Sequence, residues 1–122
     1  MVTVKDFSVD KPAYFLERKS YFEFADQPVE ARVVKVGRKF VTVKSGYREY
    51  KFEVPEYDKS ADYLAERVTY GHPCILFPTL DAFQEWKERE ELLEWFRRHQ
   101  DMLGRFDTNR LRAAKMALEG GE

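Results

Sequence analysis

The sequence predicts an α+β fold in which a small antiparallel, SH3-like β-barrel of about five strands precedes a C-terminal helical hairpin. Two patterns lead to this prediction. Short β-branched and aromatic runs, separated by turn residues, fill the first half of the chain. Apolar residues recur at helical spacing in the second half. With 122 residues, the chain fits a single domain, in which about 12–70 form the barrel and about 79–119 the helices.

The first three strands are expected at residues 13–18, 29–36 and 40–44. The middle one is rich in valine, and Val34 with Val36 lies on the face opposite Val33 with Lys35, so a twisted or bulged strand is expected. Gly37 follows it. Because glycine lacks a Cβ and takes a positive φ at low cost, a tight reversal is expected there, leading into the third strand.

Two further strand candidates follow. Residues 47–54 alternate, with Tyr50 and Phe52 on the apolar side, before a proline removes a backbone donor. Residues 63–70 are a candidate for a fifth strand, with Leu64, Val68 and Tyr70 pointing inward. Alternatively, residues 61–67 start as a helical turn. Both readings stay open.

A long amphipathic helix is expected to begin at Thr79, whose hydroxyl can cap it, and to run to about Gln100. A shorter helix should begin at Asp107-Thr108 and end at Gly120-Gly121. A sheet this small needs a helix over its open apolar face, so the stripe of the long helix should meet a strand face. That stripe comprises Phe83, Trp86, Leu93 and Phe96, widened by Leu92 and Trp95.

The overall charge and the cysteine content narrow the function classes and the location that we expect. A formal net charge of -1 gives no global attraction to nucleic acid or to an anionic membrane. The single cysteine, Cys74, cannot form an internal disulfide, and no apolar leader or membrane span is apparent. We therefore expect a cytoplasmic location and no membrane partner.

No residue set points to catalysis. The two histidines, His72 and His99, have no partners at metal-ligand spacing, and no glycine-rich loop has phosphate-binding spacing. The run His72-Pro73-Cys74 brings an imidazole and a thiol close in sequence, but the rigid proline hinders the hydrogen bond that a nucleophile pair needs. We expect no enzyme, no cofactor and no metal site.

Charge is segregated along the chain. Residues 31–52 carry seven cations against the single acid Glu49, whereas 53–66 reverse the sign. Cations interleaved with aromatic residues can hold phosphates and stack bases, although lysines on edge strands also prevent aggregation. Exposed aromatic and arginine residues are typical of protein-binding surfaces. The candidate binding residues are Arg32, Lys35, Arg38, Lys39, Lys44, Tyr47, Arg48, Lys51, Trp95 and Arg98.

The aromatic residues exceed what so small a core should hold, so some are expected at the surface. Residues 21–24 have two readings, as part of a partner-binding surface or as a loop that covers the barrel. The sequence does not choose between them.

Three runs carry a resemblance to a known group: Lys35-Val36-Gly37-Arg38-Lys39-Phe40, Tyr50-Lys51-Phe52, and Leu76-Phe77-Pro78-Thr79 before a Glu/Lys-rich helix. With them the chain resembles small bacteriophage and prophage proteins that have an N-terminal SH3-like barrel and C-terminal helices. The resemblance implies an accessory protein acting in the bacterial cytoplasm, in a group where inhibitors of host or defence proteins, including anti-CRISPR proteins, are frequent. No functional residue transfers from it.

Two hypotheses follow. The leading one is a non-enzymatic module that binds a bacterial host or defence protein and blocks it sterically, with an anti-CRISPR-like role as one form. The alternative is a nucleic-acid-binding barrel that uses the basic strand face. The protein is expected to be a monomer or a homodimer, with dimerisation through the helix between Trp86 and Trp95.

Overall fold

A computed structural model describes residues 1–20, 23–68 and 71–120. It contains two compact units, Met1–Trp86 and Lys87–Glu122. The first holds a β-barrel and the first turns of helix α1 (Leu80–Arg98), and the second holds the rest of that helix and the C-terminal segment. Among the described helices, none is both long and apolar enough to span a membrane.

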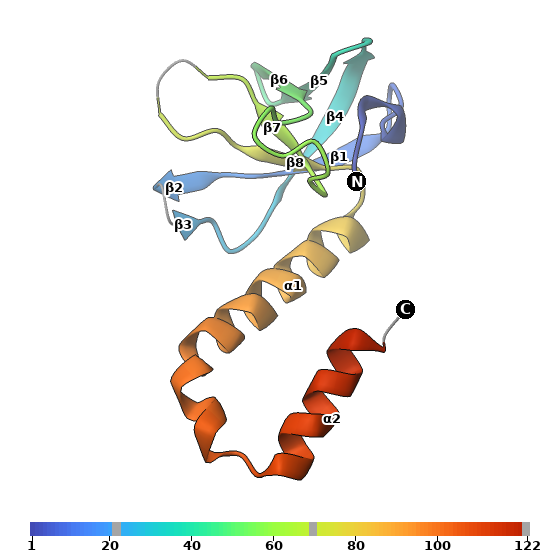
Figure 1. Cartoon of the computed structure of the whole chain (residues 1–122). Helices are drawn as coiled ribbons and strands as arrows, with labels where there is room; N and C mark the ends of the chain where they lie inside the picture. The colour runs from blue at the N-terminus through green and yellow to red at the C-terminus, as the bar shows by residue number, and fades with distance from the viewer. Residues whose placement is uncertain (21–22, 69–70, 121–122) are drawn as a thin grey trace. The chain divides into compact units, whose positions relative to one another are not determined.

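In the described residues, six antiparallel strands close a barrel in the order β1-β4-β5-β6-β7-β8, and helices follow, so the expected α+β fold is confirmed (Figure 1). A separate two-stranded sheet pairs β2 (Arg18–Ser20) with β3 (Glu23–Phe24). The barrel strands are β1 (Pro12–Leu16), β4 (Val29–Val36), β5 (Phe40–Ser45), β6 (Arg48–Glu53), β7 (Leu64–Glu66) and β8 (Ile75–Phe77).

Strand β8 is the sixth strand, which the sequence pattern did not predict. It pairs with both β1 and β7 and thereby closes the barrel. All three of its residues are buried. A strand that is covered on both faces shows no apolar-polar alternation, and three residues are too few to reveal a period.

The other strand boundaries also differ from expectation. The first strand ends at Leu16 rather than at residue 18, because Arg18 begins β2. The fifth candidate is a strand and not a helical turn, but it is short. Leu64 is buried in it as expected, whereas Val68 is 39% exposed, and the expected end at Tyr70 lies outside the described residues.

The turns confirm one expectation and correct another. The register between β4 and β5 shifts between Val33 and Lys35, which confirms the predicted bulge. The Gly37 amide donates to the Phe40 carbonyl at 2.8 Å. Gly37 does not have a positive φ, because the reversal is spread over residues 37–39, whereas Gly46 in the next hairpin has a φ of 63°.

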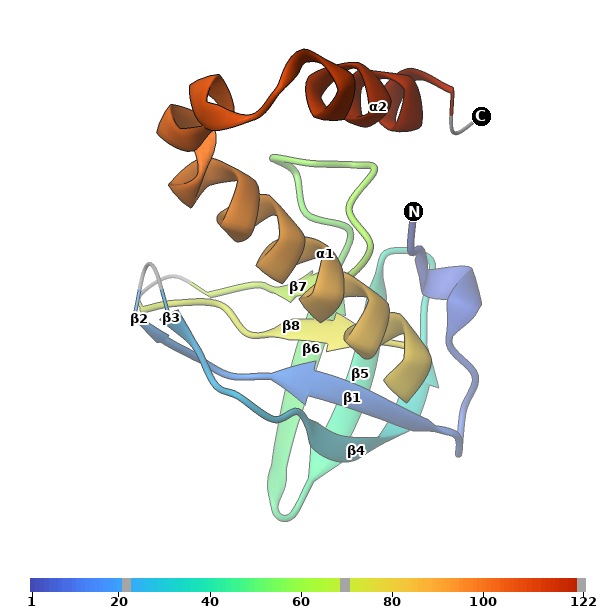
Figure 2. The same cartoon turned by 90° about the horizontal axis from the view of Figure 1, so that it is seen from below.

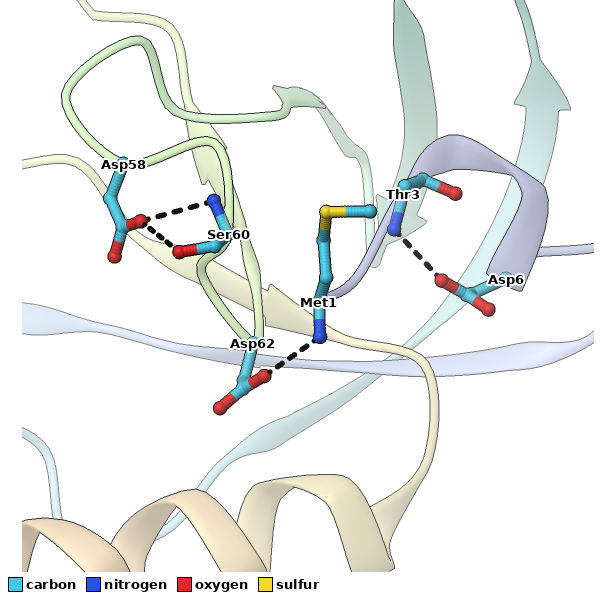
Figure 3. A network of polar contacts seen from close by, with 6 residues as sticks. All are labelled: Met1, Thr3, Asp6, Asp58, Ser60 and Asp62. Carbon is cyan, nitrogen blue, oxygen red and sulfur yellow. Dashed lines mark hydrogen bonds and ion pairs between the residues drawn. The ribbon is translucent and has the colours of Figure 1, made fainter.

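The barrel interior also includes residues N-terminal to the expected start at about residue 12. Val2 and Phe7 are buried in it beside Phe52 and Leu76. The segment is held in place by the Met1 amine, 3.1 Å from an Asp62 carboxylate oxygen, and by the Thr3 amide, which donates to the Asp6 carboxylate at 2.8 Å (Figure 3). The Thr3 hydroxyl accepts from the Lys5 amide and so caps η1 (Val4–Asp6). Figure 3 also shows Asp58 accepting from the Ser60 amide and hydroxyl, which orders the adjacent loop.

A second core lies on the outside of β1 and β8. Leu16, Ile75 and Phe77 are buried there against Phe83 of α1, with Trp86 packed beside them. Figure 2 shows the start of α1 lying over β1 and β8. The Thr79 hydroxyl accepts from the Ala82 amide at 3.0 Å, which confirms the expected cap. The first turns of α1 therefore cover a strand face, as predicted.

The rest of the predicted stripe lies in the second unit, where Leu93 and Phe96 are 38% and 44% exposed. The expected contact between the helix stripe and a strand face is therefore confirmed for Phe83 and Trp86. Helical period shows which residues share a face of a helix, but it does not show how far along the helix a neighbouring element extends.

In the second unit, α1 is followed by η2 (Gln100–Arg105) and α2 (Thr108–Glu119). The Asp107 carboxylate accepts from the Arg110 amide at 2.8 Å, so the predicted cap of this helix is confirmed. None of the described residues from 87 to 120 is buried.

Candidate binding face

Strand pairing brings most of the predicted basic residues to one outer face of the barrel, here called the basic face. Lys35 lies opposite Thr42, which lies opposite Lys51, and Arg32 lies opposite Lys44. Directly paired residues project to the same side of a sheet, and neighbouring strands are about 4.8 Å apart. The basic face comprises Arg32, Lys35, Arg38, Lys39, Lys44, Lys51 and Arg67, which are all exposed.

An aromatic ring lies in the basic face. Phe40 is partly exposed, with the Lys39 ammonium 5.5 Å and the Arg67 guanidinium 5.8 Å from its ring centroid. Such cation-π geometry places positive charge around a ring. Phe40 is one of the aromatic residues interleaved with the cations in the sequence. Arg67 lies outside the basic run 31–52 and joins the face because its amide donates to the Lys51 carbonyl.

A shallow hollow lies between the β4–β5 turn and the adjoining strands. Its volume is about 150 Å³, below the roughly 300–1,000 Å³ that is usual for small-molecule sites. This hollow can take a phosphate group or a single side chain, but it is too small to enclose a cofactor. It is lined by Lys35, Gly37, Arg38, Lys39, Phe40, Thr42 and Lys51.

Glu53 lies at the edge of the basic face. The alternation of residues 47–54 predicts it on the polar side of its strand, away from Tyr50 and Phe52. It lies opposite Phe40 and is only 8% exposed. Its Oε2 atom is 3.8 Å from the Lys39 ammonium and has no hydrogen-bond partner in the described structure. Lys39 therefore balances a buried carboxylate, so less of its charge is available to a ligand.

The other cations of the face are not neutralised in this way. Among the described residues, no ion pair is formed by Arg32, Lys35, Arg38, Lys44 or Lys51. Each is solvent exposed and keeps its positive charge toward the solvent. The face therefore combines an excess of unpaired cations with a partly exposed aromatic ring.

Two predicted residues lie at the β5–β6 hairpin, outside the basic face. Tyr47 is fully exposed at its tip, beside Gly46. Arg48 lies 4.8 Å over the ring of Tyr50, which itself packs against Phe15 with centroids 5.0 Å apart. Arg48 therefore projects to the same side of β6 as Tyr50, whereas Lys51 projects to the other side of the strand.

The remaining predicted residues, Trp95 and Arg98, lie in the second unit. The Trp95 ring stacks on His99 at 4.3 Å and is 45% exposed. Arg98 pairs with Glu94 at 3.3 Å. Both belong to the part of α1 that lies in the second unit.

The surplus aromatic residues divide between core and surface. Phe15 is buried, whereas Phe24 packs edge-on against Trp86 with centroids 5.5 Å apart. Tyr21 and Phe22, for which a covering loop or a partner-binding surface was expected, lie outside the described residues. The exposure of Trp95 fits the expectation that some aromatic residues lie at the surface.

Cys74 lies in a setting that disfavours a nucleophile. Burial raises the pKa of its thiol to about 11, and the negative charge of Glu66 adds to the effect. The Glu66 carboxylate also accepts from the Cys74 amide at 3.2 Å. At neutral pH the thiol is protonated, and the thiolate that would attack a substrate is scarce.

Alkylation of Cys74 by iodoacetamide should therefore be slow at pH 8 and rise about tenfold per pH unit up to about pH 10. Folding keeps the thiol protonated above its ordinary pKa, so stability should also fall as pH rises from about 9 toward 11. Mass spectrometry of labelled protein checks the rate. The urea-unfolded chain is the control, since its rate should level off near pH 9, and a folded-state plateau there would contradict the shift.

In the described part of the chain, no three His, Cys, Asp or Glu residues gather as a metal site would require. A second hollow of about 400 Å³ borders the basic face, where Asp10 and Glu30 oppose Arg32 and Lys44. Because this hollow is lined by both acidic and basic side chains, its charge favours neither an anionic nor a cationic ligand.

The family match covers both units of this structure. The family model described as the phage ProQ C-terminal-like domain matches residues 3–120. The chain belongs to this family. No match was found among the curated proteins or among the solved structures.

This membership confirms the resemblance to small phage proteins with a barrel and C-terminal helices. For this phage ProQ C-terminal-like domain, the coarse expectation of a phage protein is therefore met. The match runs from before β1 to the last residue of α2 and its C-cap, so it includes the basic face and the helical unit alike.

Proposed function

We propose that this phage protein is a non-enzymatic binding module whose basic face binds single-stranded nucleic acid in the bacterial cytoplasm. The observation that carries the proposal is the row Lys35, Thr42 and Lys51 across three strands, next to the partly exposed ring of Phe40. Cations along a sheet neutralise phosphates, and an aromatic ring on the same face stacks an unpaired base.

Single strands suit this surface better than a duplex. The face is formed by a barrel and presents an aromatic ring whose flat side only an unstacked base can cover. All residues of the basic face lie on barrel strands or in the segments beside them, so none belongs to a helix that could enter the major groove. Binding through phosphates and stacking would have little sequence preference.

A non-enzymatic role is supported by the size of the hollow and by the protonated Cys74 thiol. A hollow of about 150 Å³ on an open sheet does not exclude water from a reacting group. Function by binding alone requires no such enclosure.

The proposal is tested by fluorescence anisotropy with labelled 20-nucleotide single strands of RNA and DNA, and with the matching duplex, at 50–300 mM salt. The variant Lys35→Gln/Lys51→Gln should bind more weakly. Its slope of log K against log salt should be shallower by about 1.4, at about 0.7 per lost phosphate contact.

The matched control is Lys5→Gln/Lys59→Gln, which removes the same charge from two other exposed positions. This control should retain the slope of the unmodified protein. Equal slopes for the two double variants, or duplex binding as tight as single-strand binding, would overturn the proposal.

A host or defence protein is the second candidate ligand, favoured by the fully exposed Tyr47 at the β5–β6 tip, next to Arg48. Tyrosine and arginine are enriched among the residues that dominate protein interfaces. The module would then act as a steric inhibitor, and an anti-CRISPR-like role is one form of that activity.

Pull-down from bacterial lysate separates the two candidates. A stoichiometric protein that survives nuclease and high salt, and that is lost from Tyr47→Ala but retained by Tyr57→Ala, would support the second. Nucleic acid alone, lost at high salt, would support the first.

A further inference from the structure

We propose that the hollow of about 150 Å³ in the basic face binds a phosphate monoester, the phosphate group that ends a nucleic acid strand. The protein then prefers the end of a single strand to its interior. This inference rests on the proposed function, because it names the part of the strand that the basic face holds most tightly. It is carried by the charge around the hollow, by the hydroxyl of Thr42, and by the ring of Phe40 beside them.

The first observation is the charge around the hollow. Its described lining residues include no acid and four cations, Lys35, Arg38, Lys39 and Lys51. Glu53 balances Lys39 at 3.8 Å, and the other three cations form no ion pair in the described structure. An internal phosphodiester carries one negative charge, whereas a phosphate monoester carries about −1.5 to −2 at pH 7 and has three strong acceptor oxygens. Three unpaired cations around one small hollow therefore match the monoester better.

The second observation is a hydroxyl group between two of these cations. Lys35 and Lys51 are the strand partners of Thr42 on either side, so their Cβ atoms lie about 5 Å from its own. Thr42 lines the hollow and is only 8% exposed. Its hydroxyl forms no hydrogen bond with any described residue, yet it is not sealed from water. The hollow is therefore where this hydroxyl is open to a ligand, and a phosphate oxygen there can accept from it while the two ammonium groups flank the same phosphate.

The third observation is the aromatic ring on the same hollow. Phe40 is the one aromatic residue of the described lining, and part of its surface is exposed. A base inside a strand has a neighbour on each side, so it must give up a stacked neighbour to cover a protein ring. The last base of a strand has one face without a neighbour, so it can stack on Phe40 while the rest of the strand keeps its own stacking. One ring beside a phosphate-sized hollow therefore fits a terminal nucleotide.

The test is fluorescence anisotropy with three 20-nucleotide single strands of one sequence, each labelled on an internal base. One strand has a 5′-phosphate, one has a 3′-phosphate, and one has hydroxyl groups at both ends. A phosphate at one of the two ends should lower the dissociation constant about tenfold relative to the hydroxyl-ended strand. The strand that shows this gain identifies which end enters the hollow.

Two pairs of variants separate the hollow from the general charge of the basic face. Thr42→Val removes the hydroxyl and keeps the branched shape, so it should reduce the tenfold gain to less than about threefold, whereas Thr42→Ser should retain the gain. Arg38→Gln removes a cation of the hollow and should also reduce the gain. Arg32→Gln removes the same charge from the same face outside this hollow, so it should weaken the binding of all three strands by one common factor. Circular dichroism checks that each variant folds.

Equal affinity for the three strands, with the salt slope of the basic face retained, would overturn this inference and leave the proposed function in place. A gain that survives Thr42→Val, or that Arg32→Gln reduces as much as Arg38→Gln does, would also overturn it, because the terminal phosphate would then lie elsewhere on the face. Absence of binding to all three strands would overturn the proposed function as well.

Discussion

Replacing Phe77 by alanine is expected to lower the free energy of unfolding by about 3–5 kcal/mol. The ring is completely buried, and its centroid lies 5.4 Å from that of Trp86, 5.6 Å from that of Phe83 and 6.2 Å from that of Tyr63. The variant loses the transfer free energy of the ring and leaves a cavity. It also removes three aromatic contacts, of which those with Phe83 and Trp86 join the first turns of α1 to β8.

Urea unfolding followed by circular dichroism measures this loss. Tyr47→Ala is the matched control, because its ring is fully exposed and its removal should change stability by less than about 0.5 kcal/mol. In a Trp95→Phe background, the near-ultraviolet signal of Trp86 should weaken in the Phe77 variant. A loss of stability below about 1 kcal/mol would mean that the second core contributes little to the fold.

Replacing Phe40 by alanine should weaken single-strand binding about 5- to 150-fold, which corresponds to roughly 1–3 kcal/mol for one stacked base. The ring carries no charge, so the slope of log K against log salt should stay the same. This outcome distinguishes stacking from phosphate contact, which the lysine variants remove.

Two substitutions at position 40 sharpen this test. Phe40→Leu keeps apolar volume but loses the aromatic face, and should bind nearly as weakly as Phe40→Ala. Phe40→Trp keeps the face and should bind at least as tightly as the unmodified protein. Because Phe40 is partly buried, thermal unfolding of each variant is measured in parallel. If Phe40→Leu bound normally, stacking on this ring would be excluded.

Features that depend on neighbours in the chain could be predicted before the structure. The bulged or twisted character of β4, the alternation of β6 and the caps at Thr79 and Asp107 are all local. Each depends on the direction of side chains along a strand or on a hydrogen bond between residues at most three apart in the sequence. A short window of sequence therefore contains all the information needed.

Other features of the fold depend on contacts between distant segments. Strand β8 is recognisable only once β1 and β7 flank it, and Val2 enters the core only because the chain start meets Ala61. The burial of Glu53 and the position of Arg67 beside Phe40 likewise follow from strand pairing. No periodicity in one segment encodes such pairings.

The sequence by itself determined the α+β class, the basic run of the first half and the apolar helices of the second. Only the tertiary structure decided which cations share a face, because register places Lys35 and Lys51 around Thr42 and sends Arg48 to the other side. It also decided that Phe83 and Trp86 of α1 pack against Leu16, Ile75 and Phe77. Composition supplies the apolar and charged groups, whereas the closure of the barrel decides which of them water still reaches.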